Sequence, residues 1–157
     1  MFWGPVGTGK SFIAGCIANE LLKQEVMVKM TNFNTIIDDI FPLADKTEYI
    51  NALASYQLLI IDDLGVERNS EYALGIIFSV IERRIRSGRP LIITTNLPLK
   101  EIKSETMLDK RRIYDRILEM CTPMYVGGAS KREAIASMKM EKAKTLLNTN
   151  RGEEECE

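Results

Sequence analysis

The first residues of the chain form a pattern that can bind phosphate groups. The octapeptide GPVGTGKS at residues 4–11 matches G-x-x-x-x-G-K-[ST], in which glycines let successive backbone N–H groups turn toward one anion. A helix that follows adds the positive end of its dipole. We expect Lys10 to reach the β- and γ-phosphates and the Ser11 hydroxyl to bind Mg²⁺; a glycine turn that only joins a strand to a helix is the alternative. The predicted phosphate-binding residues are Gly4, Pro5, Val6, Gly7, Thr8, Gly9, Lys10 and Ser11.

Two adjacent carboxylates follow an apolar run in the segment LLIIDDLG at residues 58–65. Magnesium in phosphate sites usually takes a carboxylate from the end of a buried strand. We expect Asp62 to stand near the magnesium, through its water ligands, and Asp63 to orient or deprotonate an attacking water. A turn or a helix cap would account for the same residues.

A second apolar run ends in polar residues in the segment LIITTNLP at residues 91–98. Thr94, Thr95 and Asn96 are expected at the end of this strand, where they could hold the same water or the γ-phosphate. Turn chemistry before Pro98 is an alternative explanation for the asparagine.

The elements that position these residues alternate between strands and helices, which indicates a parallel sheet. Apolar stripes on the helices are predicted from Ile13, Ile17 and Leu21, and from Leu74, Phe78, Ile81 and Ile85. The expected fold class is α/β, a three-layer domain with a five-stranded parallel sheet flanked by helices. Strands are predicted at residues 1–3, 26–30, 56–62, 91–95 and 123–126, and helices at 11–23, within 33–41, at 71–87 and at 105–120.

Composition limits the possible classes of protein. The 157 residues fit one domain, and 45% hydrophobic with 27% charged residues is ordinary for a globular protein. Three cysteines and no histidine argue against a disulfide framework or a zinc cluster; Cys16 and Cys121 are expected in the core and Cys156 in the tail. No apolar run is long enough for a membrane span, and we expect a cytoplasmic protein with no membrane partner.

Taken together, the three motifs resemble those of the AAA+ ATPases of the helicase-loader and transposition-helper group, the DnaC-like and IstB-like proteins. The segment RRIYDRILEMCTPMYVGGAS at residues 111–130 is similar to a helix and strand of that group, and the resemblance covers about residues 2–132. It implies a P-loop NTPase in which Lys10 and Ser11 belong to Walker A, Asp62 and Asp63 to Walker B, and Asn96 to sensor 1.

The same resemblance implies that Arg116 is an arginine finger for a neighbouring subunit, with Arg112 as the second candidate and Arg132 as a candidate second sensor. If Ile113, Tyr114, Ile117, Leu118 and Cys121 point inward, helical spacing places Arg112 and Arg116 on the opposite face. An ordinary exposed pair beside Asp115 and Glu119 is the alternative. Basic runs at residues 82–89 and 109–116 could contact DNA. In a chain of net charge −1, solvated helix faces explain these runs equally well.

The resemblance implies the organisation and function of the chain. Residues 1–132 are expected to form an AAA+ core with a short first strand and without the N-terminal region of the family, and residues 133–157 a helical to disordered acidic tail. The implied function is a slow, Mg²⁺-dependent ATPase, stimulated by DNA or by oligomer formation. It would form a homo-oligomer and help to load a replicative DNA helicase onto single-stranded DNA. The alternatives are an ATPase helper of a transposase, a nucleotide-binding module with little turnover, and, least favoured, a small-molecule kinase.

Overall fold

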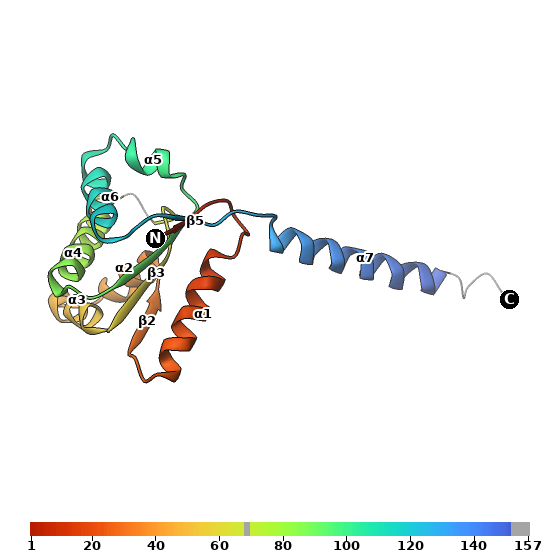
Figure 1. The fold of residues 1–157 in the computed structure, drawn as a ribbon, viewed down its shortest axis with the longest axis horizontal. Helices are drawn as coiled ribbons and strands as arrows, with labels where there is room; N and C mark the ends of the chain where they lie inside the picture. The colour runs from red at the N-terminus through yellow and green to blue at the C-terminus, as the bar shows by residue number, and fades with distance from the viewer. Residues whose placement is uncertain (68–69, 152–157) are drawn as a thin grey trace.

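A five-stranded parallel sheet lies at the centre of the computed structural model, which describes residues 1–67 and 70–151 (Figure 1). The strand order is β2-β3-β4-β1-β5, and every neighbouring pair is parallel. The carboxyl ends of the strands therefore meet at one edge, where open α/β sheets bind their ligands. The strands are β1 Phe2–Trp3, β2 Val28–Thr31, β3 Leu58–Leu64, β4 Leu91–Thr95 and β5 Met124–Tyr125.

Helices cover the two faces of the sheet unequally. Side chains alternate along β3: Leu58 and Ile60 pack against α1, whereas Leu59 and Ile61 join the larger core formed with α2 to α6. The three-layer α/β arrangement expected from the sequence is confirmed. The helices are α1 Lys10–Lys23, α2 Phe33–Ile40, α3 Lys46–Ser55, α4 Glu71–Ser87, α5 Leu99–Lys103, α6 Leu108–Met120 and α7 Lys131–Arg151.

Local signals determine the best-predicted helix. Helix α4 spans the predicted residues 71–87, because the Ser70 side chain accepts a hydrogen bond from the Ala73 N–H and Gly88 ends the helix in the left-handed conformation. Strand β4 also matches its predicted residues, 91–95. Helices α3 and α5 were not predicted from the sequence.

The buried stripe of α1 differs from the predicted one. Ala14 and Ala18 are buried and Ile17 is half-buried, but Ile13 is 38% exposed. The prediction that Cys16 lies in the core is wrong: it is exposed, because it lies 200° around the helix from Ala14 at 100° per residue. Cys121 is buried as predicted, and Cys156 lies outside the described residues.

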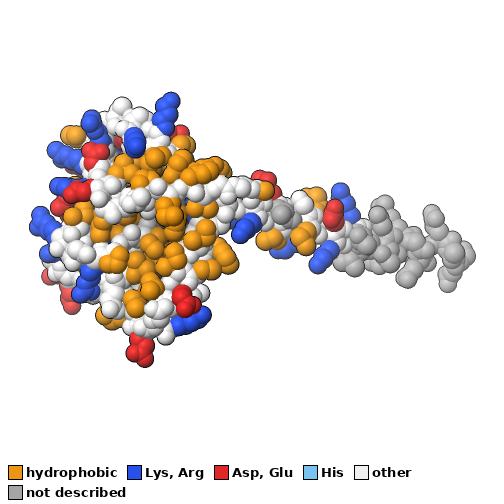
Figure 2. Space-filling model, viewed as in Figure 1, with side chains coloured by type: hydrophobic (Ala, Val, Ile, Leu, Met, Phe, Trp, Pro, Cys, Tyr) orange, Lys and Arg blue, Asp and Glu red, His pale blue; other side chains and the backbone are white. Residues whose placement is uncertain are grey.

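The face that carries α1 displays many hydrophobic side chains (Figure 2). Exposed apolar residues include Phe12 at the start of α1 and both residues of β5, Met124 and Tyr125. On the other side of the sheet, Phe78 of α4 was predicted in the core but is partly exposed.

Helix α7 extends away from the sheet (Figure 1). It begins at Lys131, within the expected core, and continues to Arg151; the expected tail residues 152–157 lie outside the described part of the chain. None of the described helices has the length and apolar character that crossing a bilayer requires.

Candidate functional site

The glycine-rich segment forms a tight loop between β1 and α1. Gly7 has a φ of 82°, a left-handed value that favours glycine, and Gly9 in the same region is the N-cap of α1. Two close contacts also require glycine: a Cβ at Gly4 would overlap the Val126 carbonyl, and one at Gly7 would overlap the Ser130 hydroxyl. No acidic residue lies in the first turn of α1, so the positive end of its dipole faces the loop uncompensated.

Lys10 lies under this loop and is 4% exposed. Its Nζ donates hydrogen bonds to the carbonyls of Gly4 at 2.8 Å and Pro5 at 2.7 Å. Burial lowers the pKa of Lys10; the carboxylates of Asp63 and Asp62 oppose this effect, and the charge of Arg132 adds to it. The ammonium group therefore lies within electrostatic reach of both carboxylates and of a second cation.

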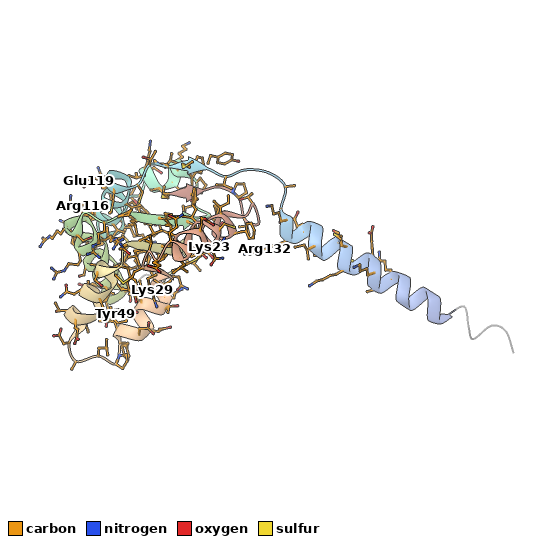
Figure 3. All side chains as sticks on the ribbon, turned by 60° about the horizontal axis from the view of Figure 1, so that its bottom comes forward. Lys23, Lys29, Tyr49, Arg116, Glu119 and Arg132 are labelled. Atoms are coloured by element: carbon orange, nitrogen blue, oxygen red, sulfur yellow. The ribbon has the colours of Figure 1, made fainter. Side chains whose placement is uncertain are left out.

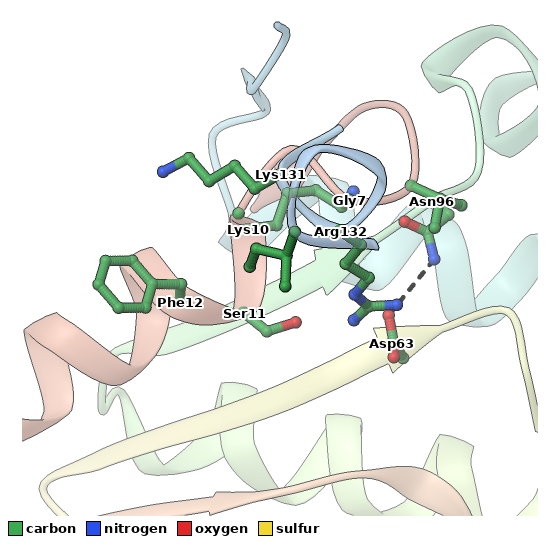
Figure 4. Close-up of a pocket in the computed structure, with 11 residues that line it drawn as sticks. Gly7, Lys10, Ser11, Phe12, Asp63, Asn96, Lys131 and Arg132 are labelled. Atoms are coloured by element: carbon green, nitrogen blue, oxygen red, sulfur yellow. Dashed lines mark hydrogen bonds between the residues drawn. The ribbon is translucent and has the colours of Figure 1, made fainter. Parts of the chain in front are cut away.

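A pocket of about 380 Å³ opens beside Lys10 at the carboxyl edge of the sheet (Figure 4). We call it the Lys10 pocket. It brings together the phosphate loop, the end of β3, the residue after β4 and the start of α7. Its lining residues are Val6, Gly7, Gly9, Lys10, Ser11, Phe12, Asp63, Asn96, Lys131, Arg132 and Ile135.

Asp63 and Asn96 lie together on one wall of the Lys10 pocket. The Asn96 Nδ2 donates a hydrogen bond of 3.4 Å to Asp63 Oδ1. Asp63 has a φ of 55°, a conformation that costs a residue other than glycine about 1–2 kcal/mol. Such strain is typical of functional sites, and here it occurs at a residue that lines the same pocket as Lys10 and Ser11.

Asp62 does not line the Lys10 pocket; its Oδ1 accepts a 2.5 Å hydrogen bond from the Thr94 hydroxyl. The expectation that Thr94 and Thr95 hold a water or the γ-phosphate is wrong. Both are fully buried, and both hydroxyls bond to β3, Thr95 Oγ1 donating to the Leu64 carbonyl at 2.7 Å. Of the three polar residues at this strand end, Asn96 is the one that reaches the pocket.

The remaining wall of the Lys10 pocket is apolar; Val6 was predicted as part of the loop, whereas Phe12 and Ile135 were missed by sequence reasoning. Val6 and Phe12 come from the loop and the first turn of α1, and Ile135 comes from α7. The Lys131 Nζ lies 5.6 Å from the centre of the Phe12 ring. One signal was present: Arg132 and Ile135 are three residues apart, which places them on the same face of a helix.

Arg116 lies on the side of the domain away from Arg132 and the Lys10 pocket (Figure 3). Its Nε is 2.9 Å from Glu82 Oε1, and its Nη1 is 2.9 Å from Glu119 Oε2. Arg112 is exposed beside it, and Ile113 and Tyr114 are buried, as the helical spacing predicted. Within one chain, Arg116 does not reach the phosphate loop.

The donor set of the Lys10 pocket suits a nucleotide with its metal ion. Lys10 and Arg132 supply positive charge for phosphates, and the Ser11 hydroxyl and the nearby aspartates supply the oxygen ligands that Mg²⁺ prefers. Among the described residues, no group of three or more Cys, Asp or Glu forms a metal cluster by itself. A metal ion here would thus depend on phosphate oxygens for several of its ligands.

Comparisons with known proteins find relatives over most of this chain. The chain is 34% identical over 122 residues to the replicative helicase loader DnaC of Escherichia coli K12, covering 74% of this chain and 49% of that protein. It is 25% identical over 143 residues to the replicative helicase loader DnaI of Bacillus subtilis 168, covering 83% and 46%. The chain thus spans about half the length of the curated relatives it matches.

Solved structures share the fold. A crystal structure of DnaI superposes with a TM-score of 0.70 at 22% identity, covering 83% of this chain and 71% of that one. AMPPCP-bound DnaA from Aquifex aeolicus superposes with a TM-score of 0.64 at 17% identity, covering 90% and 44%. The expected AAA+ fold is confirmed, and residues 1–139 match the model of the IstB-like ATP binding proteins. The chain therefore belongs to the IstB-like ATP-binding protein family.

Proposed function

We propose that the chain binds Mg²⁺-ATP in the Lys10 pocket and hydrolyses it to drive assembly of a replication complex on DNA. The observation that carries the proposal is the convergence of Lys10, Ser11, Asp63 and Asn96 on one pocket at the carboxyl edge of a parallel sheet. ATP is the proposed nucleotide because the chain belongs to a family of ATP-binding proteins.

Phosphate oxygens would take over the hydrogen bonds that Lys10 now makes to Gly4 and Pro5. The loop amides and the start of α1 would hold the β-phosphate, and Arg132 would add charge from α7. The Ser11 hydroxyl would bind Mg²⁺ directly and Asp62 through water; the ion would neutralise the charge that develops on the phosphates. The apolar wall of Val6, Phe12 and Ile135 would hold the nucleobase.

Asp63 is the proposed base for the attacking water. Its carboxylate lies in the pocket, and Asn96, which donates a hydrogen bond to it, is placed to orient the same water. Among the described residues, Lys10, Lys131 and Arg132 are the cations that line the pocket, and a further cation from a neighbouring copy would stabilise the charge that grows on the γ-phosphate during transfer. Arg116 of a neighbouring copy is the proposed source, since it is exposed and lies away from its own pocket. ATP would then be hydrolysed between subunits of a homo-oligomer.

DnaC and DnaI are replicative helicase loaders, and we propose a replicative DNA helicase as the client of this chain. The helicase would be loaded onto single-stranded DNA in the cytoplasm. The same core would serve an ATPase helper of a transposase, as the IstB-like family suggests. A nucleotide-binding module with little turnover is the third possibility.

Mixing two inactive variants tests the shared site. Lys10→Ala should abolish ATP binding, and Arg116→Ala should bind ATP but not turn it over, while Arg111→Ala, an exposed arginine on the same helix, should behave as wild type. An equimolar mixture of the Lys10→Ala and Arg116→Ala chains should regain turnover, because some interfaces then pair an intact pocket with an intact Arg116. No recovery on mixing, with an active wild type, would contradict hydrolysis between subunits.

The client is tested separately. Phosphate release by the wild-type chain should rise with protein concentration and with added single-stranded DNA. Co-purification with a replicative helicase from the same genome would support loading, and co-purification with a transposase would favour the helper function. Saturable ATP binding without phosphate release, at any protein or DNA concentration, would favour the binding module.

A further inference from the structure

The two aspartates of β3 lie in a β-bulge. Ile61 of β3 pairs with Ile93 of β4, and the next pair is Leu64 with Thr95. Between these pairs, β3 has two residues, Asp62 and Asp63, whereas β4 has one, Thr94. Two residues opposite one define a bulge, and bulges beside active sites change the direction in which a side chain points.

The bulge explains how two consecutive aspartates can both lie near Lys10. In a regular strand, neighbouring side chains point to opposite faces of the sheet, so one of the two aspartates would face away from Lys10. The left-handed φ of 55° at Asp63 breaks that alternation. Both carboxylates are consequently close enough to Lys10 to raise its pKa against the effect of burial.

One buried hydroxyl contacts both halves of the bulge. Thr94 Oγ1 accepts a hydrogen bond from the Asp63 backbone N–H at 3.0 Å and donates one to Asp62 Oδ1 at 2.5 Å. A threonine hydroxyl has one hydrogen to donate and can accept at the same time, so these two bonds are compatible. The side chain is fully buried, and no part of it lines the Lys10 pocket.

We propose that Thr94 is a positioning residue for this site, whose hydroxyl stabilises the bulge and thereby aims both Asp62 and Asp63. This inference rests on the proposed ATPase function, because it assigns the carboxylates to the metal and the attacking water. Thr95 provides the contrast: its hydroxyl donates to the Leu64 carbonyl and accepts from the Leu97 N–H, and it contacts neither carboxylate. Both threonines stabilise the strand end, but only Thr94 should affect the metal.

The test compares Thr94→Val, which removes the hydroxyl at constant shape, with Thr94→Ser, which keeps it, and with Thr95→Val. ATP affinity without Mg²⁺ should be the same in these three variants as in the wild type, because Lys10 and the loop are untouched. In Thr94→Val, the Mg²⁺ concentration for half-maximal ATP binding should rise and turnover should fall, each by about tenfold, the usual effect of losing a residue that orients a metal ligand. Thr94→Ser should restore both, and Thr95→Val should lower the melting temperature alone.

Amide exchange gives a measurement independent of activity. In the chain without nucleotide, the Asp63 amide of Thr94→Val should exchange with water about tenfold faster than in wild type or Thr94→Ser, while the Ile60 amide should not change. If Thr94→Val does not fold, the wild-type Thr94 hydroxyl proton provides the test, since a proton bonded to Asp62 should be protected from exchange. An unprotected hydroxyl would overturn the inference.

The outcomes separate this inference from the proposed function. An active wild type with Thr94→Val unchanged in Mg²⁺ dependence overturns the role of Thr94 alone. An equal shift in Thr95→Val also overturns it, because the effect would then belong to the strand end in general. A wild type that binds no ATP overturns the proposed function, whereas the exchange rates would still report whether Thr94 holds the bulge.

Discussion

The backbone N–H of Lys131 donates a 3.0 Å hydrogen bond to the carbonyl of Gly7, which joins the first residue of α7 to the middle of the phosphate loop. The Ser130 side chain sits against the same glycine, and its hydroxyl accepts a 3.3 Å bond from the Glu133 N–H at the start of α7. The loop and the beginning of α7 are therefore one packed unit. A change in the loop should be transmitted to Arg132, two residues beyond Ser130.

Gly7→Ala should disrupt this unit. The new Cβ would overlap Ser130, and the φ of 82° adds a backbone cost of about 1–2 kcal/mol. We expect a lower melting temperature and an ATP affinity reduced by about tenfold or more, a loss of at least about 1.4 kcal/mol, measured by calorimetry. Gly15→Ala is the control, because no atom lies within 4 Å of its added Cβ in α1, and it should stabilise the chain by about 0.5–1 kcal/mol. Wild-type affinity in Gly7→Ala would refute the close packing.

Phe12→Ala should weaken binding of the nucleobase but not of the phosphates. Phe12 lines the Lys10 pocket and is 69% exposed, so its removal should change stability little. Stacking of a base on an aromatic ring contributes about 1–3 kcal/mol, which predicts a loss of ATP affinity of about tenfold. Affinity for inorganic tripolyphosphate should stay the same. Leu22→Ala, another exposed apolar residue on α1, should leave both affinities unchanged; an equal loss for both ligands in Phe12→Ala would place the base elsewhere.

The sequence predicted those parts of the site that depend on local pattern. The phosphate loop, the acidic end of β3 and the asparagine after β4 each follow an apolar run, and parallel strands bring their carboxyl ends together. The partner of Thr94 depends instead on the register between β3 and β4, which is set by tertiary packing. For the same reason, Ile135 could be placed in the pocket only once α7 was known to begin beside Gly7.

The outer face of the core was predicted less well. Phe78 has the spacing of a core residue, yet it is partly exposed, because Ile77 and Ile81 already fill the interior side of α4. Helix α3 is capped by Asp45 and contributes Ile50 and Leu53 to the core, but its apolar residues are too few to give a clear helical period. Periodicity identifies a long amphipathic helix more reliably than a short one.

Glu119→Gln should make Arg116 easier to recruit to a neighbouring subunit. The Glu119 and Glu82 carboxylates raise the pKa of Arg116 and hold its guanidinium on its own chain, so reaching a neighbour's phosphate means leaving them. We expect turnover at low protein concentration to rise about twofold, a modest effect in keeping with an exposed ion pair. Adding Arg116→Ala should cancel the gain. If Glu119→Gln raises turnover equally in the Arg116→Ala background, Arg116 is not the residue released.

Arg84→Met should destabilise the fold without touching the site. Arg84 of α4 is fully buried and donates to four carbonyls, those of Ala54, Tyr56, Gln57 and Pro90, at 2.5–3.3 Å. Burial, with a smaller contribution from the charge of Arg89, lowers its pKa to about 10, so it remains a cation at neutral pH. It joins α4 to the segments that lead into β3 and β4, at the edge of the sheet opposite the Lys10 pocket.

Removing this cation leaves several buried carbonyls without their donors, which should cost about 3 kcal/mol and lower the melting temperature by roughly 10 °C. Arg83→Met is the matched control, since Arg83 is the preceding residue on α4 and is exposed; its melting temperature should stay within about 2 °C of wild type. Arg84→Lys should recover only part of the loss, because one ammonium group cannot reach all four carbonyls. ATP affinity, measured well below the melting transition, should be unchanged in all three variants, and a loss of affinity in Arg84→Met alone would mean that the two edges of the sheet are coupled.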